Sequence, residues 1–593
     1  MNNRHPLPPA TTVIKSIMAG YWSYRQYFQS ITDRALDRFV QGDWKGMQAD
    51  AIERLEAYQK ILDHTVHAIR ADLGPQDRDR DLWASAKAAI APEIDKLPAA
   101  DLAETFFNSV IRRLGNIVGV DSRLEFLREE PRPLPDPAAG QDYETFSTHG
   151  LTMADLCTDI LSASVFHPHL FALEEDARKA AQHLVECRRY SPPEQSIRHI
   201  DMIPSPFFRG MGAYLIGRMV THEGACLPLA IALINQGGTI SVDGIITDTR
   251  GFRLLFSYTH SYFHVSTDRI LELIAFLRPL LPHRRLAELY ISLGFNRHGK
   301  TELYRDLARH QNACRDIFAI SPGKAGMVMA VFNMPSDDMV FKVIRDTFAK
   351  PKRTTRRQVM AQYAYIFRHD RTGRLPDTQS FEHLRFDRGC FHPGLLRVLE
   401  ETAARSVTID AAKVSIELAY VERRVRPLDL YLGEVRFEAA CAAVIDFGQA
   451  IKDLAFSNIF PGDMLLKNFG VTALGRIIFY DFDEICPLTE CRFRRKPKAR
   501  SHEDEMASEP WYFVAENDIF PEEFENFLGL TGELRQVFMT HHKDLLDVDF
   551  WQQTQDSIRQ GVPIHVFPYT RLGSCQRVGT VEARHSESRR PKI

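Results

Sequence analysis

The stretch that decides the fold is Pro461–Gly470, which reads PGDMLLKNFG, together with the later triplet Asp481-Phe482-Asp483. Its polar residues are regularly placed, since Asn468 lies five positions after Asp463 and Asp481 lies thirteen positions after Asn468. The apolar runs between them predict a β-hairpin that turns around Leu474-Gly475. Because the two ends of a hairpin meet, we expect Asp463, Asn468 and Asp481 to converge.

These residue types at this spacing are typical of phosphoryl transfer by protein kinases. A carboxylate such as Asp463 accepts the hydroxyl proton, while an amide and a second carboxylate, Asn468 and Asp481, hold Mg²⁺ across the phosphates. The alternative is that these three polar residues lie at turns and match the kinase spacing by chance. The HRD triplet of ordinary protein kinases is replaced by Pro461-Gly462-Asp463, and Asp483 stands where those enzymes have Gly. The chain is therefore not an ordinary protein kinase.

A matching nucleotide-binding segment lies upstream of this stretch. It begins with a glycine-containing turn made of Ser321, Pro322, Gly323, Lys324, Ala325, Gly326 and Met327. The runs Met327–Phe332 and Met339–Ile344 then predict a hairpin, with Lys342 inside its second strand. Lys342 is either a solvent-facing lysine or the lysine that grips the α- and β-phosphates of ATP. The expected helix at Thr355–Arg368 offers no acid as its partner, and a hinge to adenine would fall within Tyr420–Leu430.

Two further segments match nucleotide-binding motifs in sequence but are expected to have other structures. Asp446-Phe447-Gly448 spells DFG, but it precedes Asp463, and the apolar residues around it have helical spacing. Gly294–Thr301 matches the complete P-loop pattern. A P-loop must follow a strand, whereas the residues before Gly294 have a helical period, so the glycines are expected to form a helix end and turn. A P-loop ATPase centred on Lys300 and a non-catalytic kinase-like binding module are the alternative functions.

The whole chain of 593 residues is too long for a single core. Helical periodicity dominates the first part, with an apolar stripe from Ile52 to Ile69, and helical patterns return at Met153–Arg189. Short strands are expected at Thr239–Val242 and Phe252–Tyr258. The predicted fold class is α+β: a mainly helical N-terminal regulatory domain (1–310), a bilobal protein-kinase-like domain (311–575) and a flexible basic tail (576–593).

Composition excludes several classes of protein. The 74 basic and 77 acidic residues give a net charge of −3, so no global field favours nucleic acid or an anionic membrane. No apolar run is long enough for a transmembrane helix, and the start lacks a secretory signal, so a cytoplasmic location is expected. The nine cysteines have no framework spacing and are expected to be reduced thiols; Cys486 and Cys491 lack the second pair that a zinc site needs.

Several longer motifs resemble one bacterial family, isocitrate dehydrogenase kinase/phosphatase. They are Gly294–Thr301, Ser321–Met327, Val340–Ile344, Arg368–Arg371, Asp377–Gln379, Pro461–Gly470, Tyr480–Ile485 and Ser508–Tyr512. The resemblance implies an ATP- and Mg²⁺-dependent serine kinase acting on isocitrate dehydrogenase, with Mn²⁺ as an alternative ion. It also implies a phosphatase at the same site, a regulatory domain that responds to AMP or another adenine nucleotide, and control of flux between the citric acid cycle and the glyoxylate bypass. A homodimer is one option for its assembly.

Site residues follow from the same resemblance. Ser321–Met327 and Lys342 would bind ATP, Asp463 would be the catalytic aspartate, and Asn468 and Asp481 would hold the metal. Asp377 resembles an aspartate associated with phosphatase activity; from its own surroundings it would instead be an N-cap to a helix starting at Thr378. His383 stands where better-known members are expected to have Asn.

Two basic segments have no assigned role. The segment Cys491–Arg500 and the cluster Lys350–Arg357 are either solvated loops or surfaces for an acidic partner.

Overall fold

The computed structural model describes residues 9–115, 117–128, 130–135, 143–188, 196–257, 262–313, 316–322, 326–349, 354–497, 512–515, 517–562 and 566–572. By its internal contacts the chain forms two compact units. The first unit is Met1–Arg424 with Gly561–Pro568, and the second unit is Val425–Gln560 with Tyr569–Ile593. The expected flexible tail, 576–593, lies outside the described residues.

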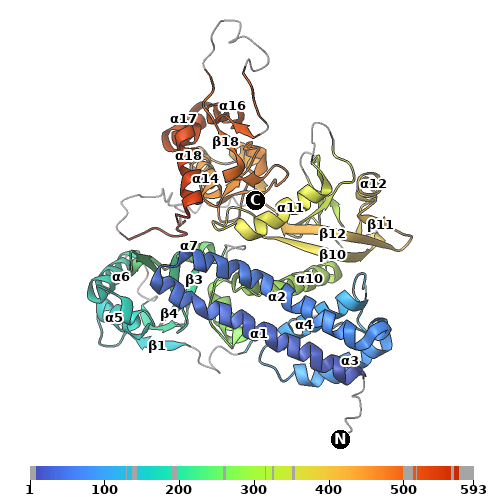
Figure 1. Ribbon diagram of the computed structural model, residues 1–593. Coiled ribbons are helices and arrows are strands. Elements are labelled where there is room, and N and C mark those ends of the chain that lie inside the picture. Colours follow the sequence, from blue (N-terminus) through green and yellow to red (C-terminus); the bar gives the residue numbers. More distant parts are fainter. Residues whose placement is uncertain are drawn as a thin grey trace, which may run out of the picture. The chain divides into compact units, whose positions relative to one another are not determined.

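Helices open the first unit, as expected (Figure 1). They are α1 (Pro9–Gln41), α2 (Trp44–Leu73), α3 (Arg80–Ile94) and α4 (Ala100–Gly115). The predicted stripe is confirmed on α2, where Leu62, Val66 and Ile69 are buried. Asp43 caps this helix by accepting a hydrogen bond from the Gly46 backbone N–H at 2.9 Å. Tyr24 on α1 packs edge-on against Tyr58 on α2, with ring centroids 5.0 Å apart.

A six-stranded antiparallel sheet follows and is larger than the sequence predicted. Its order is β1 (Glu144–Ser147), β2 (Ile197–Met202), β4 (Gly212–Thr221), β5 (Cys226–Gln236) and β6 (Thr239–Ile246), with β3 (Phe207–Arg209) paired to β4. Helices α5 (Met153–Ala163) and α6 (Leu173–Arg188) confirm the helical pattern predicted for that region, and α6 contacts β6. The strand β4 is buried along almost its whole length, so it lacks the alternation that marks a half-buried strand.

The strand predicted at Phe252–Tyr258 is wrong. Residues Thr249–Leu255 form the helix α7, and Tyr258 lies outside the described residues. Asp248 explains the difference, because its carboxylate accepts a hydrogen bond from the Gly251 backbone N–H at 2.8 Å and starts the helix. Phe252, at the start of the predicted strand, is instead buried within this short helix together with Leu255.

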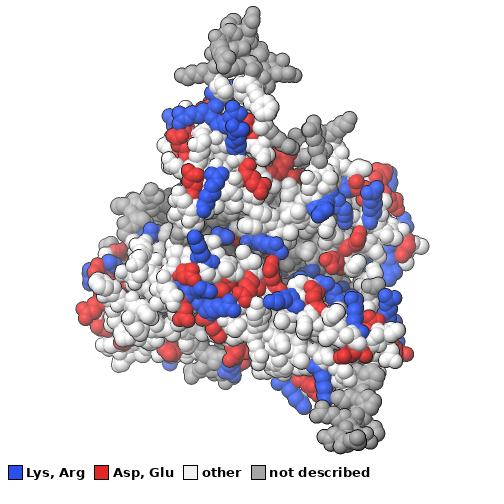
Figure 2. Space-filling view, viewed as in Figure 1, with Lys and Arg blue, Asp and Glu red and all other residues white. Residues whose placement is uncertain are grey.

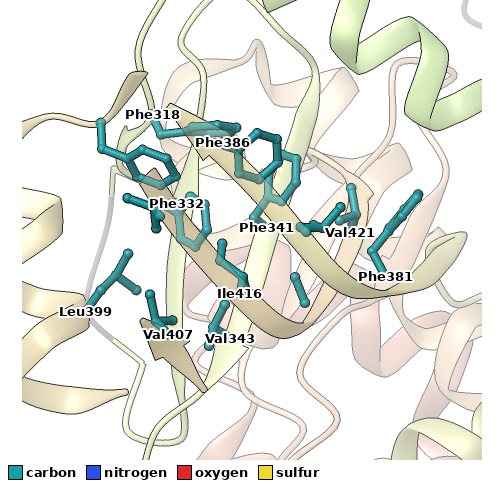
Figure 3. Close-up of a cluster of buried hydrophobic side chains, with 14 of the residues drawn as sticks. Phe318, Phe332, Phe341, Val343, Phe381, Phe386, Leu399, Val407, Ile416 and Val421 are labelled. Atoms are coloured by element: carbon teal, nitrogen blue, oxygen red, sulfur yellow. The ribbon is translucent and has the colours of Figure 1, made fainter. Parts of the chain in front are cut away.

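A second six-stranded sheet completes the first unit. Its order is β10 (Thr378–Asp387), β12 (Lys413–Arg423), β9 (Met339–Ile344), β8 (Met329–Asn333) and β7 (Ala319–Ile320), with β11 (Val407–Ile409) paired to β12. The β8–β9 hairpin was predicted and is confirmed. Helices α11 (Arg356–His369) and α12 (Pro393–Thr402) belong to the same region. Figure 3 shows the aromatic core of this sheet, in which Phe318, Phe332 and Phe341 lie together.

Helices from before residue 310 contribute to this core. After α8 (Ile270–Leu277) come α9 (Leu286–Ser292) and α10 (Asn296–Ala313). Ala287 of α9 and Leu303 and Leu307 of α10 belong to the same buried cluster as the strand residues. The expected domain boundary near residue 310 thus falls inside α10, and its position stays a prediction.

The second unit is built around the long helix α14 (Phe437–Phe456). Before it lie β13 (Arg426–Pro427) and α13 (Leu428–Glu434); after it come the short strands β14 (Ile459–Phe460), β15 (Phe469–Val471), β16 (Ile477–Phe479), β17 (Cys486–Pro487), β18 (Arg492–Phe493) and β19 (Asp518–Ile519). The last described helices of this unit are α16 (Phe524–Phe527), α17 (Gly532–His542) and α18 (Val548–Gln560). Phe460, Phe493 and Trp551 pack together, so short strands and α18 share one core.

The described surface mixes both signs of charge. Figure 2 shows Lys and Arg interspersed with Asp and Glu on the face that it presents. Within the described residues, no helix combines the length and apolar character needed to cross a bilayer.

Candidate active site

Lys342 is a buried member of β9 and has an acidic partner on the neighbouring strand. Its Nζ lies 2.5 Å from a carboxylate oxygen of Glu422, which belongs to β12. Lys342 is 8% exposed and Glu422 is 3% exposed. Glu422 also accepts a hydrogen bond from the Thr378 hydroxyl at 3.1 Å. A charge at this depth needs such a pair, so the solvent-facing alternative for Lys342 is wrong.

Sequence reasoning missed Glu422 because it looked for the acid on the helix α11. The register places Tyr420 of β12 opposite Lys342, so Glu422 lies two residues along the adjacent strand. The available signal was a charged residue at the end of the apolar run Leu418–Val421. An acidic residue at the end of an otherwise buried strand needs a cationic partner nearby, because acidic residues are rarely buried unless they are paired.

Replacing Glu422 by Gln is expected to weaken this half of the site. The change removes the Glu422 carboxylate from its buried pair with Lys342, and breaking a buried pair costs about 3–5 kcal/mol. We expect a lower free energy of unfolding in urea and weaker ATP binding by calorimetry. Glu417→Gln is the matched control, because Glu417 lies on the same strand but is exposed. Equal behaviour of the two variants would contradict a role for the pair.

The glycine-containing turn is anchored to β8 at its start. The Ser321 backbone N–H donates to the Val331 carbonyl at 3.1 Å, and the Ser321 hydroxyl donates to the Asn333 side chain at 2.8 Å. Pro322, Gly326 and Met327 are described, whereas Gly323, Lys324 and Ala325 lie outside the described residues. Ser321, at the start of the turn, is therefore held beside β8, which pairs with the strand β9 that carries Lys342.

Asp377 directly precedes β10, and its interpretation as a helix N-cap is wrong. Residues Thr378–Asp387 form a strand that pairs with β12 along its length. The Asp377 carboxylate accepts a hydrogen bond from the Gln379 side chain at 2.9 Å. Thr378, next to it, bonds Glu422, the partner of Lys342. Asp377 thus directly precedes a residue that is hydrogen-bonded to the partner of the buried lysine.

His383 interrupts the pairing of β10 with β12 without shifting its register. Its φ is +54°, and the pairing passes from Glu382 to Leu384 without it. Its carbonyl accepts a hydrogen bond from the Gly119 backbone N–H at 2.8 Å. The left-handed region tolerates Asn and, less often, His. The backbone conformation at this position is thus one that both His and the expected Asn can adopt, and the His383 side chain is exposed.

Asp463 and Asn468 are joined in the second unit by their turn. The Asn468 amide NH₂ donates to the Asp463 carbonyl at 3.1 Å, and the Asp463 carboxylate accepts from the Leu465 backbone N–H at 3.2 Å. Gly462 begins the turn with φ +75°, and a Cβ there would lie 2.5 Å from the Glu484 carbonyl oxygen. Only glycine fits such a close approach. The Asp463 turn therefore lies against the segment that follows Asp481.

The predicted hairpin between Asn468 and Asp481 is confirmed. Strands β15 and β16 pair with Phe469 opposite Phe479, and the Tyr480 backbone N–H donates to the Asn468 carbonyl at 3.0 Å. Asn468 and Asp481 thus lie at the same end of the hairpin, beside the Asp463 turn. Asn468 is buried, while Asp463 and Asp481 are half-buried.

The donor set at this end suits a hard cation. Because the Asn468 NH₂ group is bonded to backbone, its amide oxygen is the atom left for a metal. Mg²⁺ is typically held by one or two protein carboxylates with substrate phosphates and waters. The described residues contain no group of three or more His, Cys, Asp or Glu arranged for a metal. A single carboxylate with an amide oxygen therefore fits a metal shared with a nucleotide better than a resident metal centre.

Both segments that match other nucleotide-binding motifs have structural roles instead. Asp446-Phe447-Gly448 lies within α14, as predicted, and the Asp446 carboxylate accepts from the Ile477 backbone N–H at 2.6 Å. The P-loop pattern follows the helix α9; Gly294 turns the chain with φ +89°, and Lys300 lies within α10. The Lys300 ammonium lies 5.1 Å from the centre of the Phe381 ring, and burial lowers its pKa to about 7. The P-loop interpretation is not supported.

The described part of the segment Cys491–Arg500 is neutralised within the second unit. Arg492 and Arg494 pair with Asp518, Arg495 lies 3.0 Å from Asp549, and Lys496 pairs with Glu523. These basic side chains hold β18 to the neighbouring loops and to α18. Residues 498–511 and the lysine-rich start of the other cluster, 350–353, lie outside the described residues.

The candidate residues thus form two sets, one in each unit. Lys342, Glu422 and Asp377 belong to the first unit, and Asp463, Asn468 and Asp481 belong to the second unit. The division between the units falls at Arg424 and Val425, inside the segment Tyr420–Leu430 where a hinge was expected.

Comparison with known proteins covers nearly the whole chain. The family model "Isocitrate dehydrogenase kinase/phosphatase (AceK) kinase domain" matches residues 316–571, and "Isocitrate dehydrogenase kinase/phosphatase (AceK), regulatory domain" matches residues 14–315. The isocitrate dehydrogenase kinase/phosphatase of Anaeromyxobacter sp. (strain Fw109-5) is 43% identical over 557 residues, 93% of this chain and 96% of that protein. The protein of the same name from Xanthomonas campestris pv. campestris (strain 8004) is 37% identical over 565 residues, 94% of this chain and 97% of that protein.

Proposed function

The chain belongs to the isocitrate dehydrogenase kinase/phosphatase family, and from this premise we propose how its own residues carry out the two activities. It is an enzyme with kinase and phosphatase activity towards isocitrate dehydrogenase, and its kinase reaction uses ATP. The observation that carries the proposal is the local arrangement of the Asp463 turn, in which Asn468 is bonded to Asp463 and lies beside Asp481.

In the kinase direction, each residue has a distinct role. The Asp463 carboxylate accepts the proton of the substrate serine hydroxyl as that oxygen attacks the γ-phosphorus of ATP. The Lys342 ammonium, oriented by Glu422, binds the α- and β-phosphates, and the backbone of Ser321–Met327 covers them. The Asn468 amide oxygen and the Asp481 carboxylate would hold Mg²⁺, with Mn²⁺ as a substitute. When bound, the metal neutralises charge on the phosphates.

In the phosphatase direction, Asp377 would orient a water molecule towards the phosphoserine. A carboxylate suits this task because it accepts a proton from the attacking water. The proposal is supported by the position of Asp377 in the chain, directly before Thr378, whose hydroxyl donates to Glu422, the partner of Lys342. Both activities would use one phosphate position, as the resemblance to the family implies.

The remaining assignments follow the family. We propose a regulatory domain (1–310) that responds to AMP or another adenine nucleotide, a kinase-like catalytic domain (311–575) and a basic tail (576–593). The enzyme would act in the cytoplasm at the branch between the citric acid cycle and the glyoxylate bypass, with a homodimer as one form of assembly. Nucleic acid and membranes are not proposed as partners, because the charge is nearly balanced.

The test follows phosphate onto and then off a bacterial isocitrate dehydrogenase, with ATP and Mg²⁺. We expect Lys342→Met to lower serine phosphorylation by about 10²-fold or more, since a buried cation on the phosphates is lost. Lys300→Met is the matched control and should leave phosphorylation nearly unchanged, because Lys300 packs on Phe381 inside the first unit. The reverse result would favour the P-loop ATPase. No transfer by the unmodified enzyme would refute the substrate assignment.

A further inference from the structure

Two thiols lie close together just beyond the candidate metal-binding aspartate. Cys486 belongs to β17, and Cys491 follows a single 3₁₀ turn, Leu488–Glu490. Their sulfur atoms are 3.5 Å apart, within hydrogen-bonding contact of one another. Neither thiol takes part in the proposed kinase or phosphatase steps.

The backbone holds this pair firmly in register. Cys486 pairs with Phe460 of β14, and the Cys491 backbone N–H donates to the Leu488 carbonyl at 3.1 Å. The Gln555 side chain on α18 donates to the carbonyls of Leu488 and Cys491 at 2.6 and 2.7 Å. Both cysteines are thus fixed by neighbours on other elements, and their proximity is a property of the second unit.

The two thiols differ in their exposure and in the direction of their pKa shifts, as the two members of a reactive pair do. Cys486 is half-buried and accessible, whereas Cys491 is 8% exposed. The hydrogen bond between the two sulfurs lowers the pKa of Cys486 and raises the pKa of Cys491. An accessible thiol of lowered pKa next to a second thiol is the usual arrangement of a peroxide-reactive cysteine and its resolving partner.

We propose that Cys486 and Cys491 are an oxidation site that takes a hydroperoxide and closes to an intramolecular disulfide. The Cys486 thiolate attacks one oxygen of the O–O bond, so that an S–O bond forms and the alkoxide leaves and is protonated to the alcohol. Cys491 then loses its proton and attacks the Cys486 sulfur; an S–S bond forms, and the hydroxyl group leaves as water. Two thiols are oxidised, and one hydroperoxide is reduced to an alcohol and water.

The disulfide changes geometry next to the candidate active site. A disulfide bond is about 2.05 Å long, so the sulfurs must approach by about 1.5 Å from their 3.5 Å separation. Cys486 is five residues after Asp481, and Glu484 between them lies against Gly462 at the start of the Asp463 turn. Displacing reacting groups by about 1 Å can cost about 10²-fold in rate. We therefore expect the oxidised enzyme to phosphorylate its substrate about tenfold or more slowly.

Mass spectrometry tests the site without relying on activity. The full-length enzyme is treated with hydrogen peroxide or tert-butyl hydroperoxide, alkylated with iodoacetamide and digested with trypsin. The peptide Ile477–Arg492 contains both cysteines. We expect it to lose about 2 Da and to take up no alkylating groups, whereas dithiothreitol before alkylation should restore two. Cys486→Ser and Cys491→Ser should each abolish the 2 Da loss.

Cys441→Ser provides the matched control, since Cys441 is also half-buried in the second unit, on α14, and should leave the 2 Da loss intact. Far-UV circular dichroism checks that each variant is folded. A peptide that stays fully alkylated, or Cys486 that proceeds to sulfinic acid without a disulfide, would overturn the proposal. The loss of phosphorylation rests on the proposed function, and it should be reversed by dithiothreitol. A disulfide that forms without changing activity would overturn the coupling but not the site.

Discussion

Asp463→Asn is expected to reduce phosphoryl transfer by about 10²–10⁴-fold, the usual contribution of a positioned general base. The amide cannot accept the serine proton. It can still accept the hydrogen bond from the Leu465 backbone N–H, so the turn that holds Asn468 should persist. ATP affinity, measured by calorimetry with Mg²⁺, and the unfolding midpoint in urea should both remain close to those of the unmodified enzyme.

Asp410→Asn is the matched control for this variant. Asp410 also begins a turn, and its carboxylate accepts backbone hydrogen bonds from Ala412 and Lys413 at 2.8 and 2.7 Å. An asparagine preserves such a turn, so phosphorylation should be unchanged. If Asp463→Asn transferred phosphate at the normal rate, the proton acceptor would lie elsewhere. If it lost ATP binding as well, Asp463 would be a binding residue and not the base.

The parts of the site that sequence predicted share one property: their geometry is local. The hairpin from Phe469 to Phe479 brings Asn468 and Asp481 to one end because a short turn fixes its register. The DFG triplet at Asp446 was correctly placed in a helix because apolar residues with helical spacing surround it. Such features depend on neighbours within about twenty residues, which periodicity records directly.

The parts that sequence missed depend on contacts between distant segments. Lys342 and Glu422 are 80 positions apart, and only the pairing of β9 with β12 brings them together. The alternative that makes Asp377 a helix cap rests on local sequence alone, and it fails because pairing with β12 extends the next ten residues into a strand. The same tertiary contacts decide where the helices before residue 310 pack, as Leu303 and Leu307 show.

Asp481→Asn and Asp446→Asn should have opposite outcomes, although both residues begin a triplet that starts Asp-Phe. Asp481→Asn removes the one carboxylate proposed to hold the metal beside Asn468. Metal stabilisation of the transferring phosphate is worth several kcal/mol, so we expect phosphorylation to fall by about 10³-fold. The Mg²⁺ concentration for half-maximal activity should rise. Asp446→Asn keeps an oxygen that can accept from the Ile477 backbone N–H and should leave activity nearly unchanged.

This pair of variants separates metal binding from support of the hairpin. Asp446 and Asp481 both lie next to the strand β16, the first through its bond to Ile477 and the second two residues after Phe479. A variant that merely loosened β16 would lower the unfolding midpoint without changing the dependence on Mg²⁺. A metal ligand would do the reverse, because more Mg²⁺ partly compensates for a weakened site while the fold stays intact. If Asp446→Asn showed the changed Mg²⁺ dependence, the metal would belong to the DFG triplet on α14, and the assignment of Asp481 would fail.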